Sequence, residues 1–275
     1  MFMRIGSPEF GPILFATLRT GIAALFLYLC LVKFKQTKAL NGRWRQIFIV
    51  GTLNTAIPFA LFGYATLTLT AGTTSVLNAT TPMFGAIVAY LWFRDKLSAS
   101  AGFGLLLGFI GVYLLVSESI HLPASQANIN ETNALLPALA ALLAAMCYGI
   151  SANYTKKHFT GIKPLALAAG SQISATVLLL PISLFFIPDA MPSTQAITSV
   201  LFIGIICTGF AYILFFRLIA HLGPTKAISV TYLIPAFGIL WGALFLGETI
   251  SLTMLMGGVV ILLGVALTTG VFTRK

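Results

Sequence analysis

NATTPMFGAIVAYLWF, residues 78–93, aligns without a gap on TYLIPAFGILWGALFL, residues 231–246, and the pattern P-x-F-G falls at the same place in both copies. The constant offset of 153 residues extends over the longer segments 51–116 and 204–269. An apolar chain that duplicates itself in this way is typical of transporters, because pseudo-symmetric halves give one site two ways to face the membrane. The repeat therefore predicts both a fold and a class of function.

The composition places the chain in a membrane. Hydrophobic residues make up 58% of it, charged residues 8%, and the mean hydropathy is +0.98. An apolar run of about 20 residues at about 1.5 Å per residue crosses a hydrocarbon core of about 30 Å as a helix. Alternating strands of a membrane barrel would not give runs this long. The predicted spans are 12–32, 47–67, 71–93, 99–117, 134–154, 164–186, 196–216, 224–246 and 252–272.

The net charge of +10 is concentrated in alternate loops between the predicted spans. The positive-inside rule then predicts a multi-pass protein of the inner membrane with a cytoplasmic C-terminus, and no nucleic-acid partner. In this orientation the span 71–93 runs inward and its repeat partner 224–246 runs outward. The duplication is therefore predicted to be inverted.

One helix of the repeat has no visible counterpart. Upstream of residue 51 the correspondence continues at an offset of 152, with Pro12 over Pro164, so the partner of the span 134–154 would precede Met1. We expect an all-α integral membrane protein with nine visible transmembrane helices of an expected ten, in two inverted five-helix repeats. Residues 1–116 form the first repeat, which lacks most of its first helix. Residues 117–133 form an outer linker, and residues 134–275 form the second repeat. Residues 6–10 are interpreted as a loop.

Candidate substrate-binding residues gather around two matched prolines, Pro82 and Pro235. A proline inside a helix removes one backbone hydrogen bond, so each span should kink and release a carbonyl group. Polar side chains precede both kinks, and Asn78 is the strongest candidate because a buried amide seeks a partner outside its own helix. Its repeat partner is Thr231, followed by Tyr232. Kinks that serve only helix packing are the alternative.

A second set of candidates repeats a hydroxyl followed one turn later by an aromatic ring. Thr55 and Phe59 in the first half correspond to Thr208 and Tyr212 in the second, and Asn54 precedes the first pair. Such a face suits a small amphipathic solute, although aromatic residues in membrane helices also serve packing.

Two further candidates, Tyr148 and Ser151, are three residues apart in the span 134–154 and share one helix face. They are predicted to line a cavity.

Three charged residues are interpreted as structural or gating. Arg19 is the only basic residue well inside a span, where a charge costs roughly 2.5–3.5 kcal/mol, although its side chain could instead extend to the membrane surface. Asp95 and Glu248 end matched spans, and each precedes a serine, Ser98 or Ser251, expected to cap the next helix.

The sequence contains few of the features that are expected of an enzyme. No His, Cys or carboxylate group has metal-binding spacing, no glycine loop suits a phosphate, and no nucleophile has a histidine at membrane depth. We expect no cofactor and no metal.

The segments from Ser75 and from Ser229, each with a proline helix, an acidic turn and a glycine-rich last helix, resemble the EamA-like group of the drug/metabolite transporter superfamily. PEFGPILFATLRTGIAALFL, from Pro8, is similar to the second helix of that family. The resemblance implies ten helices in two inverted repeats, a central cavity, and export or exchange of small metabolites, including amino acids and related amphipathic compounds. Arg94-Asp95 departs from the usual Gly-Glu.

The leading hypothesis is therefore a carrier of small organic solutes that works by alternating access. The alternative is a non-transporting membrane subunit or pseudo-transporter, and a channel comes third. The expected partners are a small-molecule solute and the lipid bilayer.

Overall fold

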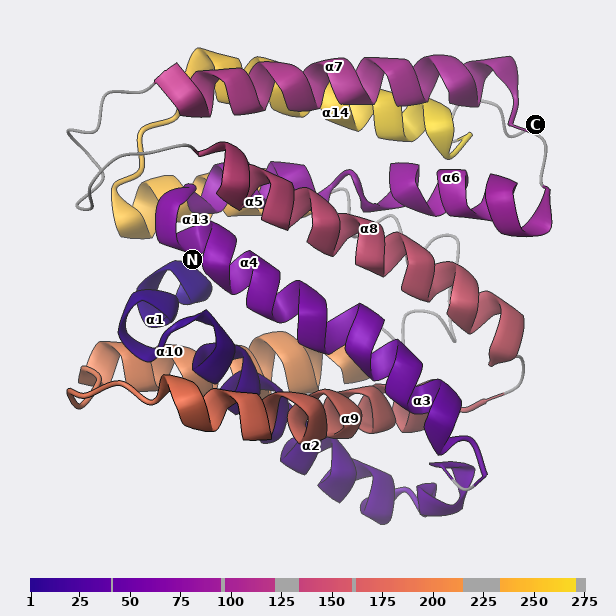
Figure 1. Cartoon of the computed structure of the whole chain (residues 1–275), viewed down its shortest axis with the longest axis vertical. Helices are drawn as coiled ribbons and strands as arrows, with labels where there is room; N and C mark the ends of the chain where they lie inside the picture. Colours follow the sequence, from indigo (N-terminus) through magenta and orange to yellow (C-terminus); the bar gives the residue numbers. More distant parts are fainter. Residues whose placement is uncertain (41, 95–96, 122–133, 160–161, 215–232, 271–275) are drawn as a thin grey trace. The chain divides into compact units, whose positions relative to one another are not determined.

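A computed structural model describes residues 1–40, 42–94, 97–121, 134–159, 162–214 and 233–270. Throughout these ranges the regular structure is helical (Figure 1). In chain order the elements are α1 (Phe2–Phe10), α2 (Pro12–Lys33), η1 (Thr37–Leu40), α3 (Trp44–Gly51), η2 (Thr52–Ala56), α4 (Ile57–Thr68), α5 (Ala71–Asn78), α6 (Thr81–Phe93), α7 (Ala99–His121), α8 (Leu135–His158), α9 (Pro164–Ser183), η4 (Leu184–Phe186), α10 (Thr194–Gly204), η5 (Ile205–Phe210), α13 (Ile234–Leu246) and α14 (Leu252–Thr268).

Seven helical segments of the described chain are long and apolar enough to cross a membrane, and α13 and α14 are shorter apolar helices. These segments lie where the apolar runs predict them. Residues 224–232 of the eighth predicted span are outside the described residues, and α13 is its described part. The seven segments are Pro12–Lys33, Trp44–Thr68, Ala71–Phe93, Ala99–Ser117, Leu135–His158, Pro164–Phe186 and Thr194–Leu214.

The start of the chain differs from the sequence-based expectation. Residues 6–10, interpreted above as a loop, belong to α1. The helix is amphipathic and packs against α2 and α10, with Phe10 and the fully buried Phe15 among the residues of the contact. Tertiary packing thus outweighs the cost of Pro8 inside a helix.

Proline residues and serine caps account for many of the helix boundaries. Proline occupies the first turn of α2, α6, α9 and α13, where its fixed φ angle suits a helix and its missing N–H costs nothing. The predicted caps Ser98 and Ser251 are confirmed, since their hydroxyls accept from the backbone nitrogens of Ala101 and Met254 at 3.1 and 2.9 Å.

The structure divides into two compact units. The first contains residues 65–153 and 231–275. Within it α7 and α14, the last helices of the two repeats, lie side by side (Figure 1). A Cβ atom on Gly104 would lie 2.6 Å from the carbonyl oxygen of Gly264, and the converse distance is also 2.6 Å. The two backbones can approach this closely only because both residues are glycine.

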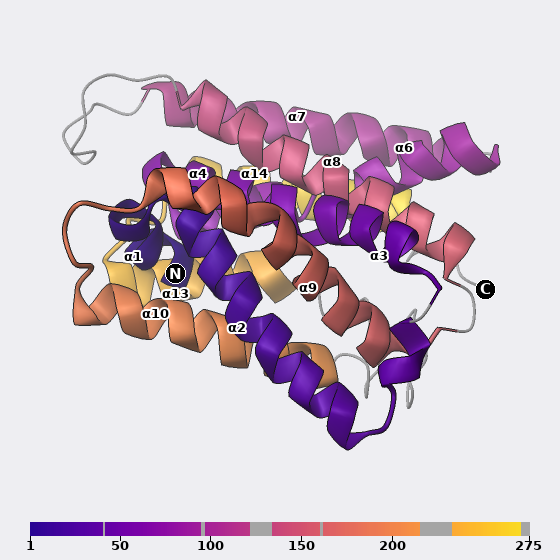
Figure 2. The ribbon, with the colours of Figure 1, turned by 60° about the horizontal axis from the view of Figure 1, so that its bottom comes forward.

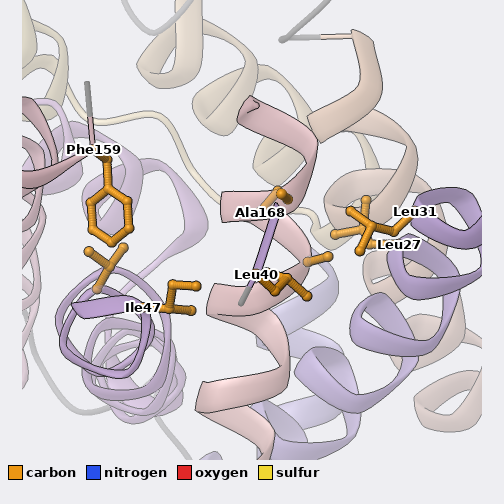
Figure 3. Packing of buried hydrophobic residues seen from close by; sticks show 9 residues of the cluster. Leu27, Leu31, Leu40, Ile47, Phe159 and Ala168 are labelled. Carbon is orange, nitrogen blue, oxygen red and sulfur yellow. The ribbon is translucent and has the colours of Figure 1, made fainter. Parts of the chain in front are cut away.

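The second unit contains residues 2–64 and 154–230. In it α2 packs along α9 and also contacts α10 (Figure 2). Buried apolar side chains of this unit pack together in one cluster (Figure 3). The labelled members of this cluster are Leu27, Leu31, Leu40, Ile47, Phe159 and Ala168.

Candidate functional site

Two π-helical turns occupy equivalent positions in the repeat. The turn η2 begins at Thr52 and η5 begins at Ile205, 153 residues later. In η5 the Thr208 hydroxyl donates to the carbonyl of Ile203, five residues back, at 2.8 Å. Wide turns of this kind interrupt the regular helix and are frequent at functional sites. They hold the two candidate threonines, Thr55 and Thr208, and both are buried.

Arg19 of α2 meets two of the predicted residues inside the second unit. Its Nε donates to the Thr208 hydroxyl at 3.0 Å, and its guanidinium carbon lies 3.6 Å from the centre of the Phe59 ring. Its Nη1 lies 3.6 Å from the Met3 sulfur. A cation over an aromatic face within about 6 Å is attracted by the ring quadrupole. The side chain is therefore engaged by the protein itself.

Tyr212 extends this group. Its hydroxyl lies next to the side-chain amides of Asn54 and Gln172 and within the field of the Arg19 charge. Arg19, Asn54, Phe59, Gln172, Thr208 and Tyr212 are called the Arg19 cluster below. Its members come from α2, η2, α4, α9, η5 and the helical residues 211–214 that follow η5, all in the second unit.

Buried polar atoms without a hydrogen bond lie in and beside this cluster. Neither polar atom of the Gln172 amide completes a hydrogen bond, and the hydroxyls of Thr55 and Ser174 make none. These three residues are at most 3% exposed. Their helices touch directly, since a Cβ atom on Gly51 would lie 2.6 Å from the Cβ of Ser174. Native proteins leave few such groups unsatisfied, and those they do leave call for an explanation.

The sequence analysis did not single out Gln172, Ser174 or Met3. For Gln172 a signal was available, because an amide within the apolar run 164–186 follows the same argument that selected Asn78. Met3 and Ser174 carry no comparable signal. Only the packing of α1 and α9 brings them to this region.

The candidates of the first unit lie around a break in the helix. α5 ends at Asn78, and Pro82 is the second residue of α6. The Asn78 carbonyl, four residues before the proline, accepts from the Thr81 hydroxyl at 2.8 Å. The carbonyl released by Pro82 is therefore already bound within its own segment, unlike the free acceptor expected from sequence. Pro235 is likewise the second residue of α13, while Thr231 and Tyr232 lie outside the described residues.

α8 contributes a direct bond to α6 in the same unit. The Asn153 Nδ2 donates to the carbonyls of Gly85 and Gly149, each at 2.9 Å. Gly149 allows this approach, because a Cβ atom there would lie 2.7 Å from the Gly85 nitrogen. The predicted Ser151 is buried with an unpartnered hydroxyl, and Tyr148 is partly buried.

Glu248 lies at the N-terminus of α5. Both of its carboxylate oxygens lie 2.9 Å from the backbone nitrogen of Ala71, and one lies 3.5 Å from that of Gly72. A carboxylate is favoured there by the free N–H groups and the positive end of the helix dipole. This contact supports a structural role. Its repeat partner Asp95 lies outside the described residues.

The side chains of the Arg19 cluster are suited to binding a ligand. The cluster combines one cation, two amides, two hydroxyls and an aromatic face within helical segments that are apolar enough to cross a membrane. Among the residues that the structure describes, no three His, Cys, Asp or Glu side chains gather to hold a metal ion.

Comparison with known proteins gives a consistent result. The model of the EamA-like transporter family matches residues 1–117 and 135–270. The Bacillus subtilis uncharacterized transporter YoaV is 26% identical, over 99% of this chain and 92% of that protein. An uncharacterized transporter of Archaeoglobus fulgidus is 24% identical, over 93% of this chain and 87% of that protein. Protein PecM of Dickeya dadantii is 24% identical, over 92% of this chain and 82% of that protein. A solved crystal structure shares the fold, with a TM-score of 0.67 at 15% identity over 99% of this chain and 95% of that one.

Proposed function

The chain belongs to the EamA-like transporter family, and from this premise we propose that it carries a small organic solute across the inner membrane by alternating access, as an exporter or exchanger. The C-terminus faces the cytoplasm in this proposal, as the loop charges require. Two inverted repeats of five helices supply the two access states, and amphipathic metabolites, amino acids among them, are the solutes considered.

The observation that carries the proposal is the Arg19 cluster. A polar group inside the membrane costs free energy, and polar residues in membrane spans therefore mark substrate paths. In this unit Arg19 contacts Thr208 of the second repeat and the Phe59 ring of the first, and the nearby polar atoms of Gln172 and Thr55 have no hydrogen bond. Asn54, Phe59, Thr208 and Tyr212 are the proposed contacts for the solute in the second unit.

The two proline breaks supply the proposed hinges. Pro82 is the second residue of α6, directly after the break that follows α5, and Pro235 is the second residue of α13. A segment divided in this way bends where the intrahelical bonds are missing. In the first unit Asn78, Tyr148 and Ser151 remain proposed binding residues, together with Thr231 and Tyr232.

The test is flux in proteoliposomes of purified protein across a panel of small metabolites. We expect uptake that saturates and shows counterflow with at least one solute. Thr208→Val should reduce this flux, because it removes the hydroxyl bonded to Arg19. Leu25→Val on the same helix is the control, since Leu25 is 64% exposed. Absence of any flux from folded protein, together with a stable co-purifying partner, would instead identify a non-transporting subunit. Flux without saturation or counterflow would identify a channel.

A further inference from the structure

Arg19 places a positive charge inside an apolar helix. It is the eighth residue of α2, which puts it about 10 Å along the helix axis from Pro12 at about 1.5 Å per residue. Such residues in membrane spans mark sites for ions or charged ligands. The charge belongs to a side chain held by Phe59 and Thr208, so its position is defined before a ligand arrives.

The stacking on Phe59 also sets the direction of the donors. A guanidinium group is planar, and its N–H bonds point outward within that plane. Because the ring covers one face of the group, the donors are directed along its edges. A carboxylate binds to such an edge, commonly through two parallel hydrogen bonds.

Independent of Arg19, other donors lie in the same part of the second unit. The Gln172 amide is fully buried and completes no hydrogen bond, although it lies beside Tyr212. Thr55, next to Asn54 in η2, is fully buried with an unpartnered hydroxyl. A buried polar group without a partner costs free energy, and a ligand that supplies acceptors removes that cost.

Resting on the proposed function, we propose that the Arg19 cluster binds the carboxylate of a small anionic solute. The Arg19 guanidinium binds the carboxylate oxygens, while the Gln172 amide and, from beside the cluster, the Thr55 hydroxyl supply further donors. Phe59 and Tyr212 contribute apolar surface for the rest of the solute. The substrate class is thereby narrowed to small solutes that carry a carboxylate.

The test compares monocarboxylic acids with their own carboxamides at pH 7.4, using ligand-induced shifts of the melting temperature of the full chain in phosphatidylcholine liposomes. Each pair keeps the carbon skeleton and nearly the same size, and replaces the charged carboxylate by a neutral amide in which an NH2 donor takes the place of one acceptor oxygen. We expect the acids that bind to do so about tenfold or more tightly than their amides, because charge-assisted hydrogen bonds are the stronger kind. Amides that bind as tightly as their acids would overturn the proposal, and so would a panel in which no acid produces a shift.

Two variants test whether Arg19 and Gln172 are responsible for the preference for acids. Arg19→Gln should abolish the preference for acids. Gln172→Glu places a carboxylate of nearly the same volume in the cluster, where it should compete with the ligand and abolish acid binding while the protein stays folded. Gln195→Glu is the matched control, since it makes the same chemical change at an exposed position of α10. Acid binding that survives in Gln172→Glu would contradict the assignment.

Anionic lipid is the other source of a similar group. If phosphatidylglycerol in the liposomes abolishes the response to acids, the ligand is a lipid and the assignment to a solute fails. The outcome is also separable from the proposed function. Flux that does not distinguish acids from amides rejects the anion site alone, whereas selective binding without flux of any solute rejects transport alone.

Discussion

The carboxylate of Glu248 closes the N-terminus of α5, with both oxygens 2.9 Å from the backbone nitrogen of Ala71. The two residues belong to different halves of the duplicated chain and to the same compact unit. This contact explains why an acid occurs at the end of an apolar helix, because helix N-termini attract negative charge. This contact and three other features of the fold each lead to an effect on stability that can be measured.

Removal of the Glu248 charge should destabilise the fold. We expect Glu248→Gln to lower the free energy of unfolding by about 1 kcal/mol, since the amide keeps the size but weakens the bonds to α5. Thermal unfolding in detergent measures the change. Asp189→Asn is the control, because Asp189 is exposed in the loop between η4 and α10. Equal melting temperatures for both variants would contradict the role of Glu248.

Replacement of Arg94 by glycine should stabilise the folded protein. Arg94 ends α6 with φ +55°, and the matched residue Gly247 ends α13 with φ +63°. A residue with a side chain pays roughly 1–2 kcal/mol in the left-handed conformation, and glycine does not. We expect Arg94→Gly to raise the free energy of unfolding by about 1 kcal/mol, and Gly247→Arg to lower it. Arg94→Ala should bring no gain, because alanine has the same steric restriction. A comparable gain from Arg94→Ala would show that the side chain, not the backbone, is responsible.

Stability should depend on pH through Glu9. Hydrogen bonds from the backbone N–H and the hydroxyl of Ser193 hold the pKa of the Glu9 carboxyl below its ordinary value of 4.5. The folded state therefore binds the proton less readily than the unfolded state, so the contribution is present above pH 4.5 and is lost as the pH falls through the folded pKa. We expect the melting temperature of the parent protein to fall more steeply below pH 4.5 than that of Glu9→Gln. Ser193→Ala should give an intermediate slope, because its backbone donor remains. Parallel curves for all three proteins would refute the role of Glu9.

Two glycines of α7 should respond in opposite ways to the same substitution. A Cβ atom on Gly104 would meet the backbone of α14 at 2.6 Å, whereas one on Gly102 meets nothing within 4 Å. We expect Gly104→Ala to destabilise the protein by about 1–3 kcal/mol through overpacking. Gly102→Ala should be neutral or stabilising by about 0.5–1 kcal/mol, since alanine is the better helix former. Similar unfolding curves for the two variants would show that α7 and α14 are not tightly packed.

Composition and the length of the apolar runs were sufficient to predict the membrane class and the positions of the long helices. Apolar runs of about 20 residues are a strong signal because the bilayer fixes their length. The repeat offset likewise predicted that Thr55 and Thr208 are equivalent, and the structure places both in π-helical turns. These features depend on neighbours close in sequence, or on a comparison of the chain with itself.

Contacts between distant segments were decided only by packing. Gln172 became a candidate when α9 brought it beside Tyr212, and Arg19 acquired defined partners when α2 and α4 placed it on Phe59. Packing of α1 against α2 and α10 also made residues 6–10 helical. A sequence records which polar groups enter the membrane, whereas the partner of each group depends on side chains that meet only after the helices have assembled.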